Sequence, residues 1–231
     1  MQMVLDWAGA FAAAALVVLQ IFLVALLLTV AIGLLGASAK LSGSRLLRRL
    51  AGLYTTVFRG TPEGLILLIV YFGSAITLTA LVKLADPATQ FVDIPPFWAG
   101  SLALGLIVGA YATETFRGAF QGVAAGQVEA GRALGLSGWQ IFAYVRLPQM
   151  WRLALPTFGN HMLSLMKNTA LVSIIGLEEI MYTAKIATSV TSEPFVMYAM
   201  VGVVYLAFTS VISLTVAQLE RHAGRHARGG R

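Results

Sequence analysis

A short polar run, Lys167-Asn168-Thr169, lies inside an apolar stretch of the chain and could bind a charged group. An ammonium, an amide and a hydroxyl side by side can donate hydrogen bonds to a carboxylate. Glu114 and Arg117 form a second polar set, three residues apart and therefore able to pair on one face of a helix. The chemistry that both sets favour is recognition of a charged solute or internal ion pairing.

Residues typical of a catalytic or metal centre do not accompany these sets. The sequence contains no cysteine, which excludes disulfides, thiolate metal sites and cysteine nucleophiles. His161 has no second histidine at ligand spacing, so we expect a histidine that is hydrogen-bonded within a helix bundle. His222 and His226 lie in a basic tail, 220–231, that is expected to be disordered, where chance explains their spacing. We predict no catalytic residue, no metal site and no cofactor bound by this chain.

The composition is that of a membrane protein. Of 231 residues, 58% are hydrophobic and only 11% are charged, whereas roughly a quarter are charged in soluble domains. The net charge of +6 is concentrated in short loops beside apolar segments, where membrane orientation explains it and nucleic-acid binding does not. The first apolar run lacks a basic start, so it is expected to be a retained anchor. One transmembrane domain, 1–231, is predicted.

Five apolar stretches are long enough to cross a hydrocarbon core of about 30 Å, which needs about 20 helical residues. The expected spans are 8–35, 64–81, 97–117, 153–177 and 195–219. The fourth is interrupted by Pro156, Asn160 and Lys167, which need a bundle interior or a cavity around them. The predicted fold class is therefore an all-α integral membrane protein with five transmembrane helices.

The distribution of basic residues predicts the orientation of these helices. Loop 36–61 contains five basic residues and the tail 220–231 contains four arginines, whereas the opposite side has only Lys83 and Lys185. By the positive-inside rule, the N-terminus is outside and the C-terminus is inside. The polar segment between the third and fourth spans then faces the cytoplasm.

That cytoplasmic segment carries local signals for two short helices. Residues 127–134 are predicted to form the first, and Gly135 supplies the left-handed residue that ends it. Ser137 and Gln140 form a capping box, which predicts a second helix that the following Leu147-Pro148 pair ends. The expected result is a helix, a tight turn and a second helix.

This hairpin, about 123–148, is too short and too charged to cross lipid. Its apolar side could seat in a groove of a partner protein, as helices in many complexes do. The alternative is an amphipathic segment that lies on lipid headgroups. A fixed bend favours docking, because a helix on a membrane surface gains little from one.

The hairpin resembles the EAA loop of ABC importer permeases, in which Glu-Ala-Ala is followed by glycine and by an aliphatic-x-Leu-Pro ending. The matching residues are Glu129-Ala130-Gly131, Gly135, Phe142 and Leu147-Pro148. Three further motifs resemble the polar amino-acid permeases, especially those for histidine, lysine, arginine and ornithine and those for opines. They are FRGTP (58–62), GAYATETFRGAF (109–120) and KNTALVSIIGLEE (167–179). At position 131 this chain has glycine where the family usually has alanine. Glycine weakens a helix by about 1 kcal/mol relative to alanine.

The resemblance implies the type I ABC importer (MetI-like) permease fold in a bacterial cytoplasmic (inner) membrane. In that family the EAA loop is the coupling helix, which seats in a cleft of a cytoplasmic ATPase subunit. The resemblance places this ATPase-coupling role on Glu129, Ala130, Gly131, Gly135 and Leu136. It also implies two ATPase copies, a second homologous permease, a periplasmic amino-acid-binding protein and surrounding membrane lipid. ATP and Mg would bind the ATPase, since this chain has no G-x-x-x-x-G-K-[ST] phosphate loop.

On this interpretation Lys167, Asn168 and Thr169 face the substrate pathway, with Glu114 at its cytoplasmic end. Two structural alternatives stay open: Lys167 could reach toward the outer interface, and Glu114 could simply pair with Arg117. An ion-coupled secondary transporter is the rival function, and the absence of an internal repeat argues against it. An intramembrane enzyme is a second rival, for which no catalytic constellation is present.

Overall fold

The structure is a computed structural model that describes residues 2–228 and the side chains of residues 6–223. Every regular element in this range is helical. In chain order they are α1 (Gln2–Leu41), α2 (Arg45–Gly60), α3 (Glu63–Ala85), α4 (Pro96–Gly122), α5 (Ala125–Ala133), α6 (Gly138–Gln140), a π-helical segment (Ile141–Arg146), α7 (Leu147–Asn168), a 3-10 helix (Thr169–Ile175), α8 (Ile180–Thr191) and α9 (Pro194–Arg228).

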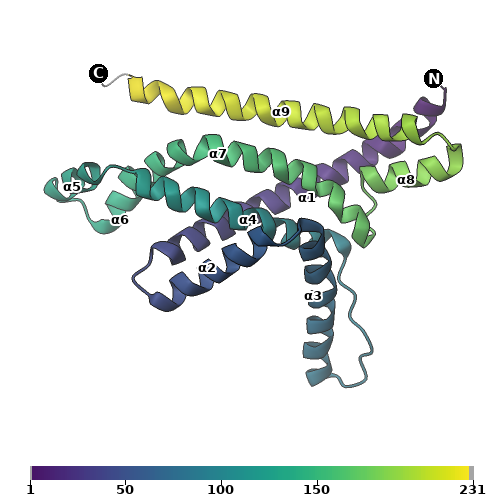
Figure 1. Ribbon diagram of the computed structural model, residues 1–231, viewed down its shortest axis with the longest axis horizontal. Helices are drawn as coiled ribbons and strands as arrows, with labels where there is room; N and C mark the ends of the chain where they lie inside the picture. The colour runs from purple at the N-terminus through teal and green to yellow at the C-terminus, as the bar shows by residue number, and fades with distance from the viewer. Residues whose placement is uncertain (1, 229–231) are drawn as a thin grey trace.

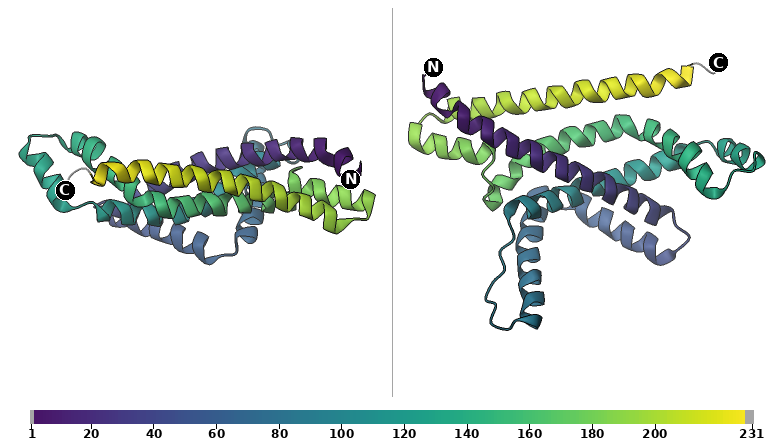
Figure 2. Two further views of the ribbon diagram at one scale, coloured as in Figure 1. Left: turned by 90° about the horizontal axis from the view of Figure 1, so that it is seen from above. Right: turned by 180° about the vertical axis from the view of Figure 1, so that it is seen from behind.

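The long helices α1, α4, α7 and α9 run along the longest axis of the molecule (Figure 1), with α1 packed mainly on α4 and α9 packed on α7 and α8. The short helices α5 and α6 lie at the same end of the bundle as the C-terminal end of α9, whereas α8 and the start of α1 lie at the other (Figure 2). Helix α3 leaves the bundle at a steep angle, and residues 86–95 return beside it. The two described ends of the chain therefore lie at opposite ends of the bundle.

Four helices within the described residues are long and apolar enough to cross a membrane: 6–41, 63–85, 96–122 and 194–223. Each contains one expected span. The fourth expected span, 153–177, differs, because α7 ends at Asn168 and a 3-10 helix continues to Ile175. Gly176, with φ of 84°, closes that turn in the left-handed conformation. Five spanning α-helices are thus not established.

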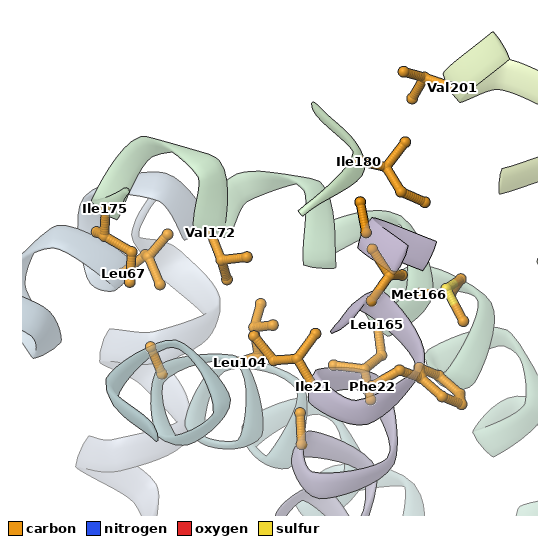
Figure 3. Close-up of a cluster of buried hydrophobic side chains, with 14 of the residues drawn as sticks. Ile21, Phe22, Leu67, Leu104, Leu165, Met166, Val172, Ile175, Ile180 and Val201 are labelled. Carbon is orange, nitrogen blue, oxygen red and sulfur yellow. The ribbon is translucent and has the colours of Figure 1, made fainter. Parts of the chain in front are cut away.

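Glycines bring α1 and α4 into close contact. A Cβ atom on Gly105 of α4 would stand only 2.6 Å from Cβ of Leu28, and one on Gly109 would stand 2.9 Å from a methyl carbon of Ile32. Two glycines four residues apart in this way let helix backbones approach closely, which is how helices associate where lipid removes the hydrophobic driving force. Figure 3 shows the neighbouring core, where apolar side chains from most of the long helices meet around Ile21, Leu104 and Leu165.

The expected end of a helix at Leu147-Pro148 is wrong. Residues 138–168 form one continuous helical run, because α6, the π-helical segment and α7 follow one another without a loop. The backbone N–H of Leu147 donates to the carbonyl oxygen of Phe142, five residues earlier. Pro148 lacks an N–H, and the wider π turn before it accommodates the ring where the hydrogen-bond pattern changes.

The expected disorder of the tail is also wrong for its described part. Helix α9 continues to Arg228, so residues 220–228 are helical. Each residue added to an existing helix gains one backbone hydrogen bond without a new nucleation step, and alanine, glutamate and arginine have high helix propensity. The last three residues of the tail lie outside the described residues.

Candidate functional site

The hairpin between α4 and α7 has the predicted local geometry. Ser137 and Gln140 form the capping box: the Ser137 N–H donates to Gln140 Oε1 at 2.8 Å, and the Gln140 N–H donates to Ser137 Oγ at 3.3 Å. Gly135 has a φ of 76° and ends α5. Its N–H donates to the carbonyl oxygen of Arg132, and that of Leu136 donates to the carbonyl oxygen of Gly131. These two bonds make a Schellman motif, which fixes the turn.

Gly131 is the buried contact between the two arms of the hairpin. A Cβ atom there would stand 3.1 Å from Cγ1 of Ile141 and 3.6 Å from Cδ1 of Leu136. The glycine therefore gives Ile141 room to pack on α5. This contact supplies a structural reason for the departure from alanine.

The surface around Glu129 and the tip of the hairpin is not covered by the described part of this chain. Glu129 and Ala130 are exposed, and Glu129 makes no hydrogen bond or ion pair with any described residue. Leu134 and Trp139 are 81% and 72% exposed at the tip, where the hairpin protrudes from the bundle (Figure 1). An unpaired carboxylate beside exposed large apolar side chains has the character of a docking element.

The run Lys167-Asn168-Thr169 lies where α7 changes into the 3-10 helix, and its three side chains have different surroundings. Lys167 is exposed and Thr169 is buried, donating from Oγ1 to the carbonyl oxygen of Met166 at 2.7 Å. The amide nitrogen Nδ2 of Asn168 is buried and makes no hydrogen bond within the described residues, although Glu63 at the start of α3 is its polar neighbour. A buried amide left in this way is available to a ligand.

Glu114 is held by two cations. Arg117 Nε donates to Glu114 Oε2 at 2.9 Å, which confirms the predicted pairing. Lys40, at the end of α1, pairs with the other carboxylate oxygen and also donates to Thr55 Oγ1 of α2 at 2.6 Å. A doubly compensated carboxylate favours the structural interpretation of Glu114. Sequence reasoning missed Lys40 because a lysine just after an apolar span looks like an orientation signal.

A buried carboxyl that sequence reasoning missed connects the 3-10 helix, α8 and α9. Glu179 is fully buried and caps α8 by accepting a hydrogen bond from the Tyr182 N–H at 3.1 Å. The Tyr205 hydroxyl of α9 donates to Glu179 across 3.5 Å and lies 3.1 Å from Thr169 Oγ1. Burial raises the pKa of the Glu179 carboxyl from 4.5 to about 7. The sequence offered one signal for this role: Glu179 directly precedes an apolar segment, where an acidic residue can act as the N-cap of a helix.

His161 is hydrogen-bonded inside the bundle, as predicted. Its Nε2 lies 2.8 Å from Thr115 Oγ1, and its ring lies beside Tyr111 of α4. These contacts fix the imidazole between α4 and α7.

Comparison with known proteins assigns the chain to a family. Residues 29–225 match the family described as the inner membrane component of binding-protein-dependent transport systems. The chain belongs to this family. It is 40% identical over 219 residues to the histidine/lysine/arginine/ornithine transport system permease protein HisQ of Escherichia coli K12, covering 95% of each chain. It is 37% identical to the arginine ABC transporter permease protein ArtQ of Haemophilus influenzae, covering 97% of this chain and 98% of that one.

A solved structure described as an amino acid ABC transporter with histidines has the same fold. Its chain is 31% identical, superposes with a TM-score of 0.78, and the match covers 94% of this chain and 96% of that one. The all-helical MetI-like fold expected from the resemblance is thereby confirmed. This protein is a transport component of the inner membrane.

Proposed function

We propose that this protein is the permease subunit of an ATP-driven importer for polar, basic amino acids such as arginine, histidine, lysine, ornithine or an opine. The observation that carries the proposal is the 40% identity, across 95% of both chains, with a permease named for four of these amino acids. A match over 219 of the 231 residues spans nearly the whole chain and is not confined to one segment.

The orientation we propose puts the hairpin and the C-terminal end of α9 in the cytoplasm and the start of α1 outside. The placement of these segments at opposite ends of the bundle supports it (Figure 1), as does the arginine-rich segment at the start of α2. Helix α7 and the 3-10 helix would together make the fifth crossing. Their 29 residues, 147–175, have a combined helical length of about 45 Å.

The partners we propose are two ATPase subunits, a second homologous permease and a periplasmic amino-acid-binding protein. ATP and Mg would be bound by the ATPase subunits. On the hairpin, Glu129, Ala130, Gly131, Gly135 and Leu136 would form the contact: Glu129 and Ala130 at the surface, and the other three maintaining the turn.

The continuous helical run 138–168 supplies a mechanical connection for coupling. One end of the run is the second arm of the hairpin, and the other end is the Lys167-Asn168-Thr169 junction. A helix of 31 residues spans about 45 Å and transmits a displacement along its axis. Closure of the ATPase subunits would therefore move the junction directly and alternate the access of the path between the two sides of the membrane.

The substrate pathway that we propose passes the same junction. The unsatisfied Asn168 amide and the exposed Lys167 ammonium can donate hydrogen bonds to the carboxylate of an amino acid. Replacing Lys167 by methionine should lower uptake by roughly tenfold, the effect of losing one charge-assisted hydrogen bond. Lys83→Met, which removes an exposed lysine from the last turn of α3, is the matched control. Unchanged uptake by Lys167→Met would exclude this lysine from the path.

The proposed function is tested by reconstituting the chain with its ATPase, second permease and binding protein in vesicles. Uptake of radiolabelled arginine should require Mg-ATP at the ATPase face and the binding protein at the opposite face. Competition with unlabelled histidine, ornithine and neutral amino acids measures the substrate class. Uptake driven by an ion gradient without ATP would contradict the proposal and indicate a secondary transporter.

A further inference from the structure

A buried chain of oxygen atoms leads from Glu179 to the junction between α7 and the 3-10 helix. Glu179 Oε2 lies 3.5 Å from the Tyr205 hydroxyl, and that hydroxyl lies 3.1 Å from Thr169 Oγ1. Thr169 Oγ1 lies 2.7 Å from the carbonyl oxygen of Met166. Glu179 and Thr169 have no exposed surface. Three contacts between oxygen atoms therefore connect the start of α8, through α9, to the end of α7.

These three contacts have only two hydroxyl protons between them. A hydroxyl donates once, whereas an ionised carboxylate and a carbonyl oxygen only accept. If Glu179 is ionised, Tyr205 donates to it, and Thr169 donates either to Tyr205 or to the carbonyl oxygen behind it, not to both. A third proton, on Glu179, removes the conflict, because the carboxyl then donates to Tyr205 and Tyr205 donates to Thr169. Thr169 keeps its bond to Met166, and each contact has its own proton.

No charged side chain is placed to hold Glu179 ionised. On α1, α7, α8 and α9, the titratable side chains of the described residues are exposed apart from Lys40, His161, Tyr182 and Tyr205. The 3-10 helix has no titratable residue. Lys40 pairs with Glu114, and His161 is hydrogen-bonded to Thr115. On α3, Glu63 neighbours Asn168. Tyr205 is thus the one titratable side chain among these that hydrogen-bonds to the Glu179 carboxyl.

Burial without a countercharge favours the protonated carboxyl. The Tyr182 N–H donates to Glu179 Oε1 at 3.1 Å, which leaves Oε2 to carry the proton toward Tyr205. Burial raises the pKa of Glu179 to about 7, in spite of that N–H. The carboxyl therefore changes its charge within the range of pH in which bacteria live, by losing the proton to water.

The bond from Thr169 to Met166 closes a turn over Lys167 and Asn168. These two residues lie between its ends in the sequence, and they are the ones that we propose donate to the carboxylate of an amino acid. When Glu179 is ionised, Thr169 loses either this bond or its bond to Tyr205. The first loss opens the turn, and the second detaches the turn from α9. The charge of a residue outside the junction thus changes the support of the residues inside it.

We propose that Glu179 is a positioning residue for the substrate pathway, and that its proton fixes the turn that presents Lys167 and Asn168. The inference rests on the proposed function and adds a regulation to it: uptake is fast with the carboxyl protonated and slow with it ionised. Glu179 does not touch the substrate. It acts through Tyr205 and Thr169, whose hydroxyl protons follow its own.

The proton is located first, by infrared spectroscopy of the purified full chain in nanodiscs. A protonated carboxyl has a carbonyl band that is separate from the bands of carboxylates. At about pH 6 the unchanged chain should show one such band that Glu179→Gln lacks, and at about pH 8 this band should be lost. Glu178→Gln changes the exposed neighbour and should leave the band in place. Absence of the band at about pH 6, or its full persistence at about pH 8, would overturn the proposal.

The effect on transport is measured as arginine uptake by the reconstituted importer at about pH 6 and about pH 8. The protonated fraction of a carboxyl with a pKa of about 7 falls about tenfold between these values, and uptake should fall by about as much. Glu179→Gln should abolish the fall, because its amide N–H₂ donates to Tyr205 at every pH. At about pH 8 this variant should therefore exceed the unchanged chain several-fold. Glu178→Gln should retain the fall, and the ratio to it removes any pH dependence of the partner subunits.

Tyr205→Phe removes the middle of the chain and keeps the ring that packs in the core. It should hold uptake, at both pH values, at the low level that the unchanged chain has at about pH 8, while its thermal unfolding curve shows that it is folded. A fall as steep as that of the unchanged chain, in either Glu179→Gln or Tyr205→Phe, would overturn the proposal. If the unchanged chain took up no arginine at either pH, the proposed function itself would be contradicted, and the infrared result would still decide where the proton lies.

Discussion

The hairpin and the bundle use the same kind of side chain in opposite ways. In the bundle, Glu114 is paired with two cations, and Glu179 is buried against a backbone N–H and a tyrosine hydroxyl. In the hairpin, Glu129 is exposed and has no partner among the described residues. The first two carboxyl groups are used by the fold, whereas the third is available to another molecule.

The difference follows from what holds each region together. The hairpin is fixed by bonds between near neighbours, such as the capping box at Ser137 and the Schellman motif at Gly135. Neither of these two motifs uses a charged side chain. The bundle brings together residues that are far apart in the sequence, such as Lys40 and Glu114. Their ion pair connects α1 and α4, so these charged side chains stabilise the fold. Substitutions of the glutamates should therefore separate function from stability.

The largest expected effect is on transport, from Glu129→Lys. Reversing an exposed charge leaves the hairpin bonds intact but would present a repelling group to the ATPase cleft that we propose as its partner, where loss of a charged contact costs several kcal/mol. Uptake by the reconstituted importer should fall by about a hundredfold or more, with either loss of the ATPase from the complex or ATP hydrolysis without uptake. The thermal unfolding of the chain should be unchanged.

Glu193→Lys is the control, since it reverses an exposed glutamate at the opposite end of the bundle. It should retain the ATPase subunits. Normal uptake by Glu129→Lys would mean that the unpaired carboxylate is not a docking group, and the contrast between hairpin and bundle would lose its functional meaning.

The second prediction concerns pH, at Glu179. The folded chain keeps this proton up to about pH 7, whereas the unfolded chain loses it near the ordinary value of 4.5. Because the folded state binds more protons in this window, the free energy of unfolding should fall as the pH rises from about 4.5 to about 7, then level off. The fall should be roughly 3 kcal/mol, since the pKa differs between about 7 and 4.5 and each pKa unit corresponds to about 1.4 kcal/mol.

Glu179→Gln should remove most of this pH dependence, measured by unfolding of the purified chain in detergent across the same range. Glu178→Gln changes the exposed neighbour and should leave the profile as it is. If both variants retained the profile, the carboxyl responsible would lie elsewhere and Glu179 would not be the buried counterpart of Glu129.

The third prediction addresses the close helix contact in the bundle. In Gly105→Ala the new methyl group would overlap Cβ of Leu28, an atom that cannot move without its backbone. Overpacking of this kind costs about 1–3 kcal/mol, which a detergent unfolding curve resolves. Gly118→Ala, on the same helix but with no atom within 4 Å of the new methyl, should be neutral or slightly stabilising. Similar curves for both variants would show that α1 and α4 are not held at that distance.

The sequence predicted the turn and the capping box of the hairpin in detail because their signals are local. A glycine after a short helix and a serine three residues before a glutamine specify their own hydrogen bonds, and the structure has both. Four of the five expected spans lie within apolar helices for a similar reason, since length and composition are properties of a segment.

Long-range partners could not be predicted in this way. Lys40 and Glu114 are 74 residues apart in the sequence, and no local sequence signal near either residue indicates that they pair. The continuous helix through Pro148 and the change to a 3-10 helix after Asn168 depend on how neighbouring turns exchange hydrogen bonds and on packing against other helices. The same limit applied to Glu179, whose partner Tyr205 is 26 residues away.

The smallest effect is expected from Gly131→Ala. This substitution tests whether the hairpin is held only by hydrogen bonds between near neighbours or also by the side-chain contact between its two arms. Alanine favours α5 by about 1 kcal/mol, but its methyl group would press on Cγ1 of Ile141 at 3.1 Å, so that side chain must shift by a few tenths of an ångström. The two effects should nearly cancel in the hydrogen exchange of the α5 amides. Gly126→Ala, on the same helix with no atom near the new methyl, has only the gain and should slow exchange by up to about fivefold. If both variants slowed exchange equally, Ile141 would adapt freely to the new methyl group, and the turn alone would join the two arms of the hairpin. If Gly131→Ala instead made exchange faster, the side-chain contact between the arms would determine the stability of the hairpin, as packing does in the bundle.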